Sequence, residues 1–304
     1  MKVSFIMPCR NKAPHVAEAV RSVFDQTYTP MELVFSDQGS TDGTTSILER
    51  LVNDYNGPNR VRLLNCPEIE LRGMPGLNAN LNWIDRHIEG DVVITSSADD
   101  LNDPYRAEYV VRAFKEFNPS YVCTGVKYTE PDGSDLRFTH FPEIRDRWLG
   151  TAECFKYQIH SSGSSAWARD LWEKHGPLKG CEQQDMILPA MALFERGIYY
   201  VDKPLHTYIN HADVANTGFQ GQIRAADDEE ERAQLVELNN FMNVKNWTEI
   251  FRRIQEQPGW IERMDQLAVA ALLEKITACA FSWAQVRETL IMATPQIPPM
   301  PMRI

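Results

Sequence analysis

The chain has 304 residues, 43% apolar and 24% charged, which is typical of a folded, soluble protein. Its 42 acidic and 31 basic side chains give a net charge of −11, which argues against nonspecific nucleic-acid binding as the main role. The six cysteines are scattered without a CxxC pair, so they indicate neither a zinc site nor a disulfide framework and favour a reducing cytoplasm.

Strand and helix patterns alternate through the first half of the chain. Residues 3–7 are an apolar run that predicts a buried strand, and the apolar side chains of residues 16–24 recur at helical spacing. The alternation continues with strands expected at residues 32–36, 61–64 and 91–96, and helices near residues 44–55, 77–84 and 104–117. This order predicts an α/β fold around a largely parallel sheet.

The sheet is expected to become mixed after the fourth strand. A strand at residues 121–124 and a hairpin around residues 131–133 indicate an antiparallel addition, and another strand is expected at residues 198–201. The serine- and glycine-containing residues 161–165 are interpreted as a flexible polar loop.

The last third of the sequence predicts a helical appendage. The pattern turns helical from about Gly221, which divides the chain into a domain at residues 1–216, a helical extension at residues 221–294 and a flexible tail at residues 295–304 with four prolines. The apolar face of the extension is expected to pack on the first domain or across a homodimer, with peripheral membrane contact as an open alternative.

No run of residues reads as a membrane-spanning segment or an export signal. The apolar N-terminal run at residues 3–7 is far too short for a signal peptide. The most apolar late stretch, residues 267–283, is interrupted by Glu274 and Lys275. We therefore expect a location in the cytoplasm, either free or at the periphery of a membrane.

Aspartates at the ends of expected elements form a candidate chemical site. Asp37 follows the second strand, and Asp99 and Asp100 follow the fourth. Asp185 precedes a late helix. Ligands of open α/β sheets gather at the carboxyl ends of strands, where such carboxylates would form a metal and acid/base site. Aspartates are also favoured in turns and at helix N-caps, so spacing alone leaves both interpretations open.

Two ordered motifs narrow the choice. The first strand ends in Pro8-Cys9-Arg10-Asn11, and Gln26-Thr27-Tyr28 is followed by Asp37-Gln38-Gly39-Ser40-Thr41-Asp42-Gly43-Thr44. This pair resembles the signatures of the family 2 glycosyltransferases, which have the GT-A fold, an α/β domain that binds a nucleoside-diphosphate sugar. The resemblance extends from about residue 3 to residue 211. It implies donor contacts from the residues Pro8, Cys9, Arg10, Asn11, Asp37 and Gly39, with Asp37 at the base.

Later motifs resemble the catalytic segments of the same family. Ser97-Ala98-Asp99-Asp100 is similar to its Asp-x-Asp-Asp segment, which implies donor contacts from Ser97 and Ala98 and a divalent metal on Asp99. Glu182-Gln183-Gln184-Asp185 is similar to the late acidic pair whose Asp is the catalytic base. His211 matches a histidine that reaches the metal or the diphosphate.

These residue types suit sugar transfer. Hard cations such as Mn²⁺ or Mg²⁺ prefer oxygen ligands, and one or two carboxylates with phosphate oxygens and water complete the shell. An ionised Asp185 would accept the proton of the attacking hydroxyl, and single displacement with one base implies inversion. We expect a nucleoside-diphosphate donor, UDP by family frequency, and a glycan, lipid-carrier, protein or modified-nucleobase acceptor.

Three positions depart from the family pattern. Gln38, Ser97 and Gln184 stand where the family has acidic residues. They keep a second interpretation open, in which a degenerate relative binds a nucleotide sugar or a partner without transfer, although the retention of Asp99 and Asp185 favours activity. A nucleotidyltransferase is a third alternative, but its glycine-rich, basic phosphate loop is missing after the first strand.

Overall fold

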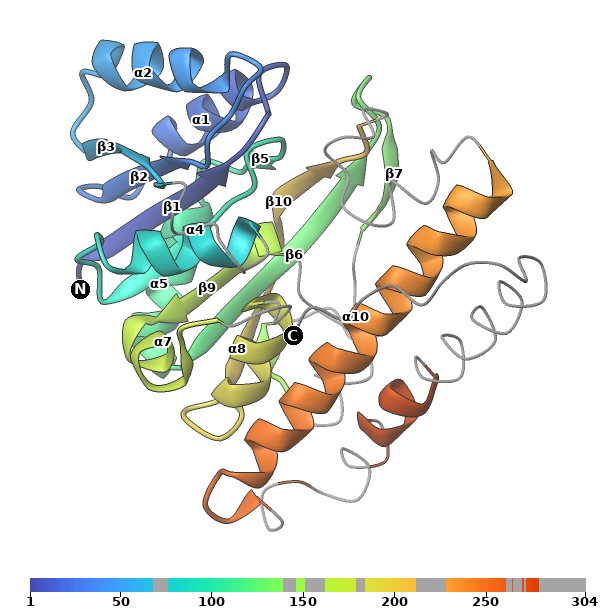
Figure 1. Ribbon diagram of the computed structural model, residues 1–304. Coiled ribbons are helices and arrows are strands. Elements are labelled where there is room, and N and C mark those ends of the chain that lie inside the picture. Colours follow the sequence, from blue (N-terminus) through green and yellow to red (C-terminus); the bar gives the residue numbers. More distant parts are fainter. Residues whose placement is uncertain are drawn as a thin grey trace.

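One mixed sheet organises the molecule (Figure 1). The computed structural model describes residues 1–67, 76–138, 146–150, 162–178, 184–211, 228–260, 264, 270 and 272–278. The strands are β1 (Val3–Cys9), β2 (Glu32–Asp37), β3 (Arg60–Asn65), β4 (Val92–Thr95), β5 (Leu101–Asn102), β6 (Tyr121–Thr129), β7 (Asp135–Phe138), β8 (Arg147–Trp148), β9 (Ser165–Ala168) and β10 (Ile198–Ile209). The helices are α1 (Val16–Phe24), α2 (Thr44–Asp54), α4 (Gly76–Asp85), α5 (Arg106–Phe117), α7 (Arg169–His175), α8 (Gln184–Ala192) and α10 (Glu229–Gln255), with a 3-10 turn η1 (Ser162–Ser164).

The strand order confirms the prediction of a parallel sheet that becomes mixed. It runs β3-β2-β1-β4-β9-β6-β10-β5, with β7 paired to β6 and β8 to β10. Strands β1 to β4 are parallel neighbours. Strand β9 enters antiparallel between β4 and β6, and β10 then runs parallel to β6. The carboxyl ends of β1, β2, β4, β6 and β10 therefore all point toward the same edge of the sheet.

Successive side chains along β1 point to opposite faces of the sheet, and buried apolar side chains lie on both faces. Phe5 and Met7 lie in a cluster with the buried residues of α1, α2 and α5. Ile6 lies in a second cluster with residues of α4, α7, α8 and α10. Because both faces are covered by helices, the central strands β1, β2 and β4 are buried on both sides, as parallel strands usually are.

Residues 162–165 of the segment 161–165 do not form the flexible loop that its composition predicts, and residue 161 lies outside the described residues. Within the described part, residues 162–164 form η1 and Ser165 begins β9, and both Ser164 and Ser165 are fully buried. Their polar atoms are accommodated by buried partners: the hydroxyl of Tyr121 donates to Ser165 Oγ at 2.5 Å, and Arg106 donates to its carbonyl at 3.3 Å.

A helix of 27 residues, α10, packs against α8 (Figure 1). It buries Trp247, Ile250 and Ile254 in the same cluster as Ile6. Arg253 Nη1 donates to the carbonyl of His175 at 2.6 Å, which fixes the helix to the end of α7. Among the described residues, no helix is long and apolar enough to cross a membrane.

Candidate functional site

The loops after β1 and β2 are joined by hydrogen bonds at the carboxyl edge of the sheet. Asn11 N–H donates to Ser40 Oγ at 2.9 Å, and Thr41 N–H donates to Asn11 Oδ1 at 2.9 Å. Lys12 N–H donates to Thr44 Oγ1 at 2.7 Å. Asn11 has a φ of 48°, a left-handed conformation that asparagine tolerates better than most residues. The sequence motifs therefore build one rigid double loop.

Asp37 lies at the base of this double loop and is buried. Its carboxylate accepts hydrogen bonds from Ser40 N–H at 3.1 Å, Ser40 Oγ at 2.5 Å and Thr45 Oγ1 at 3.1 Å. Gly39, next to it, has a φ of 68°, which disfavours side chains at that position. The turn thus presents an acceptor-rich carboxylate in a fixed orientation.

Asp99, after β4, is the meeting point of three distant segments. Its carboxylate is paired with the ammonium group of Lys12 from the loop after β1. Its main-chain oxygen lies 2.8 Å from Nε2 of His211, which follows β10. The ring of His211 stacks on His15, with centroids 3.6 Å apart. The structure therefore brings Asp99 and His211 together, as predicted from sequence, and adds Lys12 and His15.

Asp100 fixes the end of β10 beneath this cluster. It is 2% exposed, lies 3.2 Å from Nε2 of His206 and accepts a hydrogen bond from Ile209 N–H at 3.1 Å. Burial lowers the pKa of His206 against the opposing effect of Asp100, so the ring is neutral at pH 7. Nε2 then carries the proton and donates to Asp100, which ties the strand that leads to His211 to the Asp99 loop.

A fully buried arginine lies behind Asp100. Burial lowers the pKa of Arg106 to about 9, while Tyr121 and Asp100 act in the opposite direction. Arg106 Nη1 donates to Asn102 Oδ1 at 2.5 Å, and its guanidinium lies over the ring of Phe5. The guanidinium remains charged at pH 7.

The other predicted donor-binding residues differ in what they expose. Cys9 and Ala98 are buried in the apolar cluster that contains Phe5 and Met7. Burial, with Asp37 and Asp99 nearby, raises the pKa of the Cys9 thiol and keeps it protonated. Pro8 and Ser97 are half-buried and Arg10 is exposed.

Asp185 occupies the first turn of α8 and is half-buried. Pro189 lies inside the same helix and not in its first turn, contrary to the alternative in which Asp185 caps the helix. Glu182 and Gln183 of its motif lie outside the described residues.

The donor set at Asp99 fits a divalent cation that is shared with a diphosphate. No group of three or more His, Cys, Asp or Glu side chains suited to a metal occurs in the part of the chain that the structure describes. Mg²⁺ and similar ions are commonly held by one or two carboxylates plus substrate phosphates and water. The Asp99 carboxylate meets the first part of that requirement, whereas Nε2 of His211 lies against the main-chain oxygen of Asp99 and Lys12 contacts the carboxylate.

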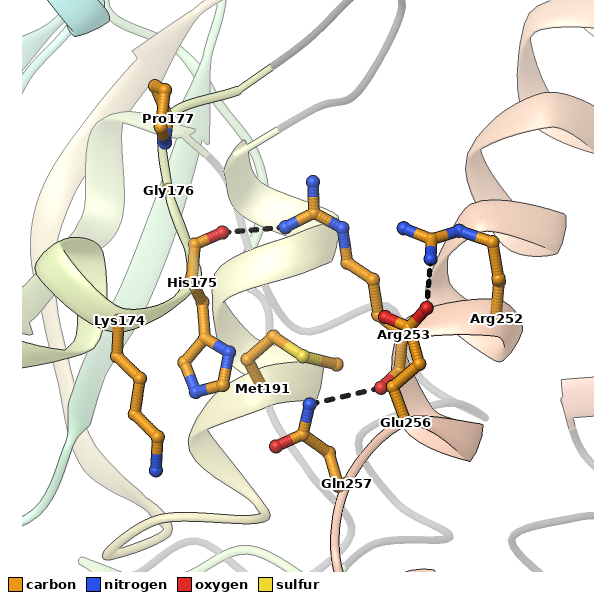
Figure 2. Close-up of a pocket in the computed structure, with 9 residues that line it drawn as sticks. All are labelled: Lys174, His175, Gly176, Pro177, Met191, Arg252, Arg253, Glu256 and Gln257. Atoms are coloured by element: carbon orange, nitrogen blue, oxygen red, sulfur yellow. Dashed lines mark hydrogen bonds and ion pairs between the residues drawn. The ribbon is translucent and has the colours of Figure 1, made fainter.

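A separate pocket of ≈ 250 Å³ lies between α7, α8 and α10 (Figure 2). Its charged lining groups are paired with one another or with neighbours: Arg252 with Glu256, and His175 with Glu195 at 2.9 Å. Figure 2 shows Arg253 directed to the carbonyl of His175. These contacts form a polar joint that holds α10. The pocket lies away from the loops around Asp99.

Comparisons with known proteins identify the family of the chain and several relatives. The model of Glycosyl transferase family 2 matches residues 4–199. The putative glycosyltransferase EpsE of Bacillus subtilis is 35% identical over 124 residues, which cover 41% of this chain and 42% of EpsE. The hyaluronan synthase of Pasteurella multocida is 27% identical over 152 residues, 49% of this chain and 15% of the synthase. The chain thus spans less than half the length of these curated relatives.

Solved structures share the architecture across nearly the whole chain. S. aureus TarS 1-349 in complex with UDP-GlcNAc superposes with a TM-score of 0.56 at 18% identity and covers 97% of this chain and 93% of that one. The mannosyltransferase PcManGT from Pyrobaculum calidifontis, in complex with GDP-Man and Mn²⁺, gives 0.62 at 19% identity, covering 98% and 76%. The predicted GT-A fold is confirmed, and with the family match over residues 4–199 the chain belongs to glycosyl transferase family 2.

Proposed function

We propose that the chain is an inverting glycosyltransferase that moves a sugar from a nucleoside diphosphate to an acceptor hydroxyl. The observation that carries the proposal is the meeting of Lys12, Asp99 and His211 at the carboxyl edge of the sheet, in a chain of this family. The solved relatives, one in complex with UDP-GlcNAc and one with GDP-Man and Mn²⁺, support a nucleotide-sugar donor. A UDP-sugar is the first donor to test, and a GDP-sugar is tested for comparison.

The double loop is the proposed nucleoside end of the donor site. Asp37 would accept hydrogen bonds from the base, since its carboxylate is already held in a fixed orientation by Ser40 and Thr45. The predicted contacts from Cys9 and Ala98 would be made by their backbones, and those from the remaining donor-binding residues, Pro8, Arg10, Asn11, Gly39 and Ser97, by exposed or half-buried groups.

The diphosphate end is proposed to lie at Asp99. Asp99 and His211 would hold Mn²⁺ or Mg²⁺, and a cation there stabilises the negative charge that develops on the leaving diphosphate. The contact between Nε2 of His211 and the main-chain oxygen of Asp99 holds the ring beside this loop, while the carboxylate of Asp99 is paired with Lys12.

Asp185 is the proposed general base. Its place in the first turn of α8 favours the ionised carboxylate, because the N-terminal end of a helix stabilises negative charge.

Residues 1–216 are proposed as the transferase domain, with α10 as part of the helical extension at residues 221–294 and a tail at residues 295–304 outside the described residues. A glycan, lipid-carrier, protein or modified-nucleobase acceptor remains a prediction from the sequence. A homodimer through the C-terminal helices likewise remains a prediction.

The proposal is tested by comparing Asp185→Asn with Asp99→Ala. Asp185→Asn keeps the shape of the side chain and removes the base, so turnover should fall by about 10²–10⁴ while donor affinity stays the same. Asp99→Ala should weaken Mn²⁺-dependent nucleotide binding and turnover together. Asp170→Asn is a matched control, since Asp170 lies in the first turn of α7 and is exposed.

Binding is measured by calorimetry and turnover by release of the nucleoside diphosphate, on the same preparations. Equal turnover in wild type and Asp185→Asn would remove Asp185 as the base. Nucleotide-sugar binding without transfer across a broad acceptor panel would favour the degenerate binding protein, for which Gln38, Ser97 and Gln184 are the motivation.

A further inference from the structure

The contact between Lys12 and Asp99 is unexpected for a carboxylate that is proposed to hold a divalent cation. The ammonium group and the carboxylate are in direct contact, and the two side chains are only 13% and 17% exposed. An ammonium group and a metal ion compete for the same carboxylate oxygens, and two cations at one partly buried carboxylate repel each other. The protein therefore holds its own cation where the metal is proposed to bind.

We propose that Lys12 is a displaceable counter-ion of Asp99. Its ammonium group lowers the affinity of Asp99 for the metal until a nucleoside diphosphate enters the site, and it then pairs with the diphosphate. This inference rests on the proposed function. It assigns to Lys12 a role in the order of binding, because metal and donor would bind tightly only together.

The backbone around Lys12 is held by hydrogen bonds, so displacement from Asp99 would involve its side chain alone. Lys12 N–H donates to Thr44 Oγ1 at 2.7 Å, and Ala13 N–H donates to Asp42 Oδ2 at 2.9 Å. Asn11 is held to Ser40 on the other side. The four-carbon stem of lysine allows its ammonium group to turn without movement of these anchored residues.

The charge balance at the site agrees with this role. Ser97 stands where the family pattern has an acidic residue. Of the two carboxylates in this loop, Asp99 contacts the ammonium group of Lys12, and Asp100 is engaged by His206 and Ile209. One carboxylate neutralised by one ammonium group attracts a divalent cation weakly. A diphosphate adds negative charge for both the metal and the lysine, and lysine is a common phosphate ligand.

The test compares wild type with Lys12→Met, which keeps the length of the stem and removes the charge. Mn²⁺ binding is measured without nucleotide, by electron paramagnetic resonance of free Mn²⁺, and UDP binding is measured at saturating Mn²⁺ by calorimetry. Lys12→Met should bind Mn²⁺ about tenfold more tightly without nucleotide, and UDP about tenfold more weakly, as loss of one charge pair implies.

Three further variants locate the effect. Lys12→Arg keeps the cation and should retain the weak Mn²⁺ binding of wild type. The double variant Lys12→Met with Asp99→Ala should lose the tighter Mn²⁺ binding of Lys12→Met, because that binding depends on Asp99. Lys115→Met, on α5 beside Tyr28, removes a lysine charge elsewhere and should behave as wild type.

The two hypotheses fail in different ways. If wild type with UDP binds no Mn²⁺, the proposed metal site is wrong and the counter-ion role falls with it. If wild type with UDP binds Mn²⁺ but Lys12→Met equals wild type without nucleotide, only the counter-ion role of Lys12 is overturned.

Discussion

Removal of the Asp100 carboxylate should destabilise the fold more than removal of its neighbour Asp99. Asp100 is buried and accepts hydrogen bonds from Ile209 N–H and from Nε2 of the fully buried His206. Asp100→Ala leaves both donors without their acceptor. It also removes the negative charge that favours the ionised form of Arg106.

The magnitude follows from these contacts. An unsatisfied buried donor costs about 1–3 kcal/mol, and Ile209 is half-buried, so Asp100→Ala should lower the free energy of unfolding by about 2–4 kcal/mol. Asp99→Ala removes an ion pair whose side chains are 13% and 17% exposed, so it should cost more than a surface pair does. Because the freed ammonium group of Lys12 can turn toward water, the cost should stay at about 1–2 kcal/mol. Asp100→Asn keeps an acceptor oxygen for Ile209 and should lie between the two.

Urea unfolding followed by tryptophan fluorescence measures the three free energies on one scale. An effect of Asp100→Ala below about 1 kcal/mol, or one no larger than that of Asp99→Ala, would refute the argument that Asp100 fastens the end of β10. Because His211 lies two residues after Ile209, the same variant should also weaken Mn²⁺-dependent nucleotide binding.

Two more substitutions test the packing around the site and the joint at α10. Gly163→Ala would place a methyl group 2.4 Å from Nε2 of the buried His206 and 3.0 Å from Ser97 Oγ, and such overpacking should cost about 1–3 kcal/mol. An unchanged thermal midpoint would contradict that close approach. Hydrogen bonds and ion pairs with Arg252 and Arg253 lower the pKa of Glu249 from 4.5 to about 2, so its stabilisation is complete above pH 4.5 and is lost as the pH falls toward 2. The difference between the urea midpoints at pH 5.5 and pH 3.5 should therefore be smaller in Glu249→Gln than in wild type. Glu173→Gln, which changes an exposed glutamate, is the control and should behave as wild type. The same difference in all three proteins would show that Glu249 does not contribute to the loss of stability in acid.

Elements with a strong local pattern were predictable from the sequence. The apolar period of residues 16–24 matches the buried face of α1, and the runs that predicted β1 and β2 were extended by only one or two residues. The hairpin predicted around residues 131–133 is present between the antiparallel strands β6 and β7, and Gly133 adopts a φ of 84° in its turn. These signals act over a few residues, so a single sequence contains them.

The segment around Ser164 and Ser165 was mispredicted because its partners are distant. A run of small polar residues is typical of a loop, and the pattern does not reveal that Tyr121 and Arg106, 44 and 59 residues away from Ser165, satisfy it inside the core. The same holds for Lys12: a lysine beside a family motif gives no sign that its ammonium group pairs with Asp99. The motifs gave Asp37, Asp99 and His211 as candidates, and the role of Asp185 stays a prediction.

The two ends of the proposed donor site differ in how much of the chain each requires. The contacts that join the loops after β1 and β2 link residues 29 and 32 positions apart. Those at Asp99 link residues 87 and 112 positions apart. Contacts that are close in sequence form sooner, and chains are synthesised from the N-terminus. A growing chain thus has the segments for the nucleoside end once β3 has emerged, whereas the diphosphate end has to wait for residue 211.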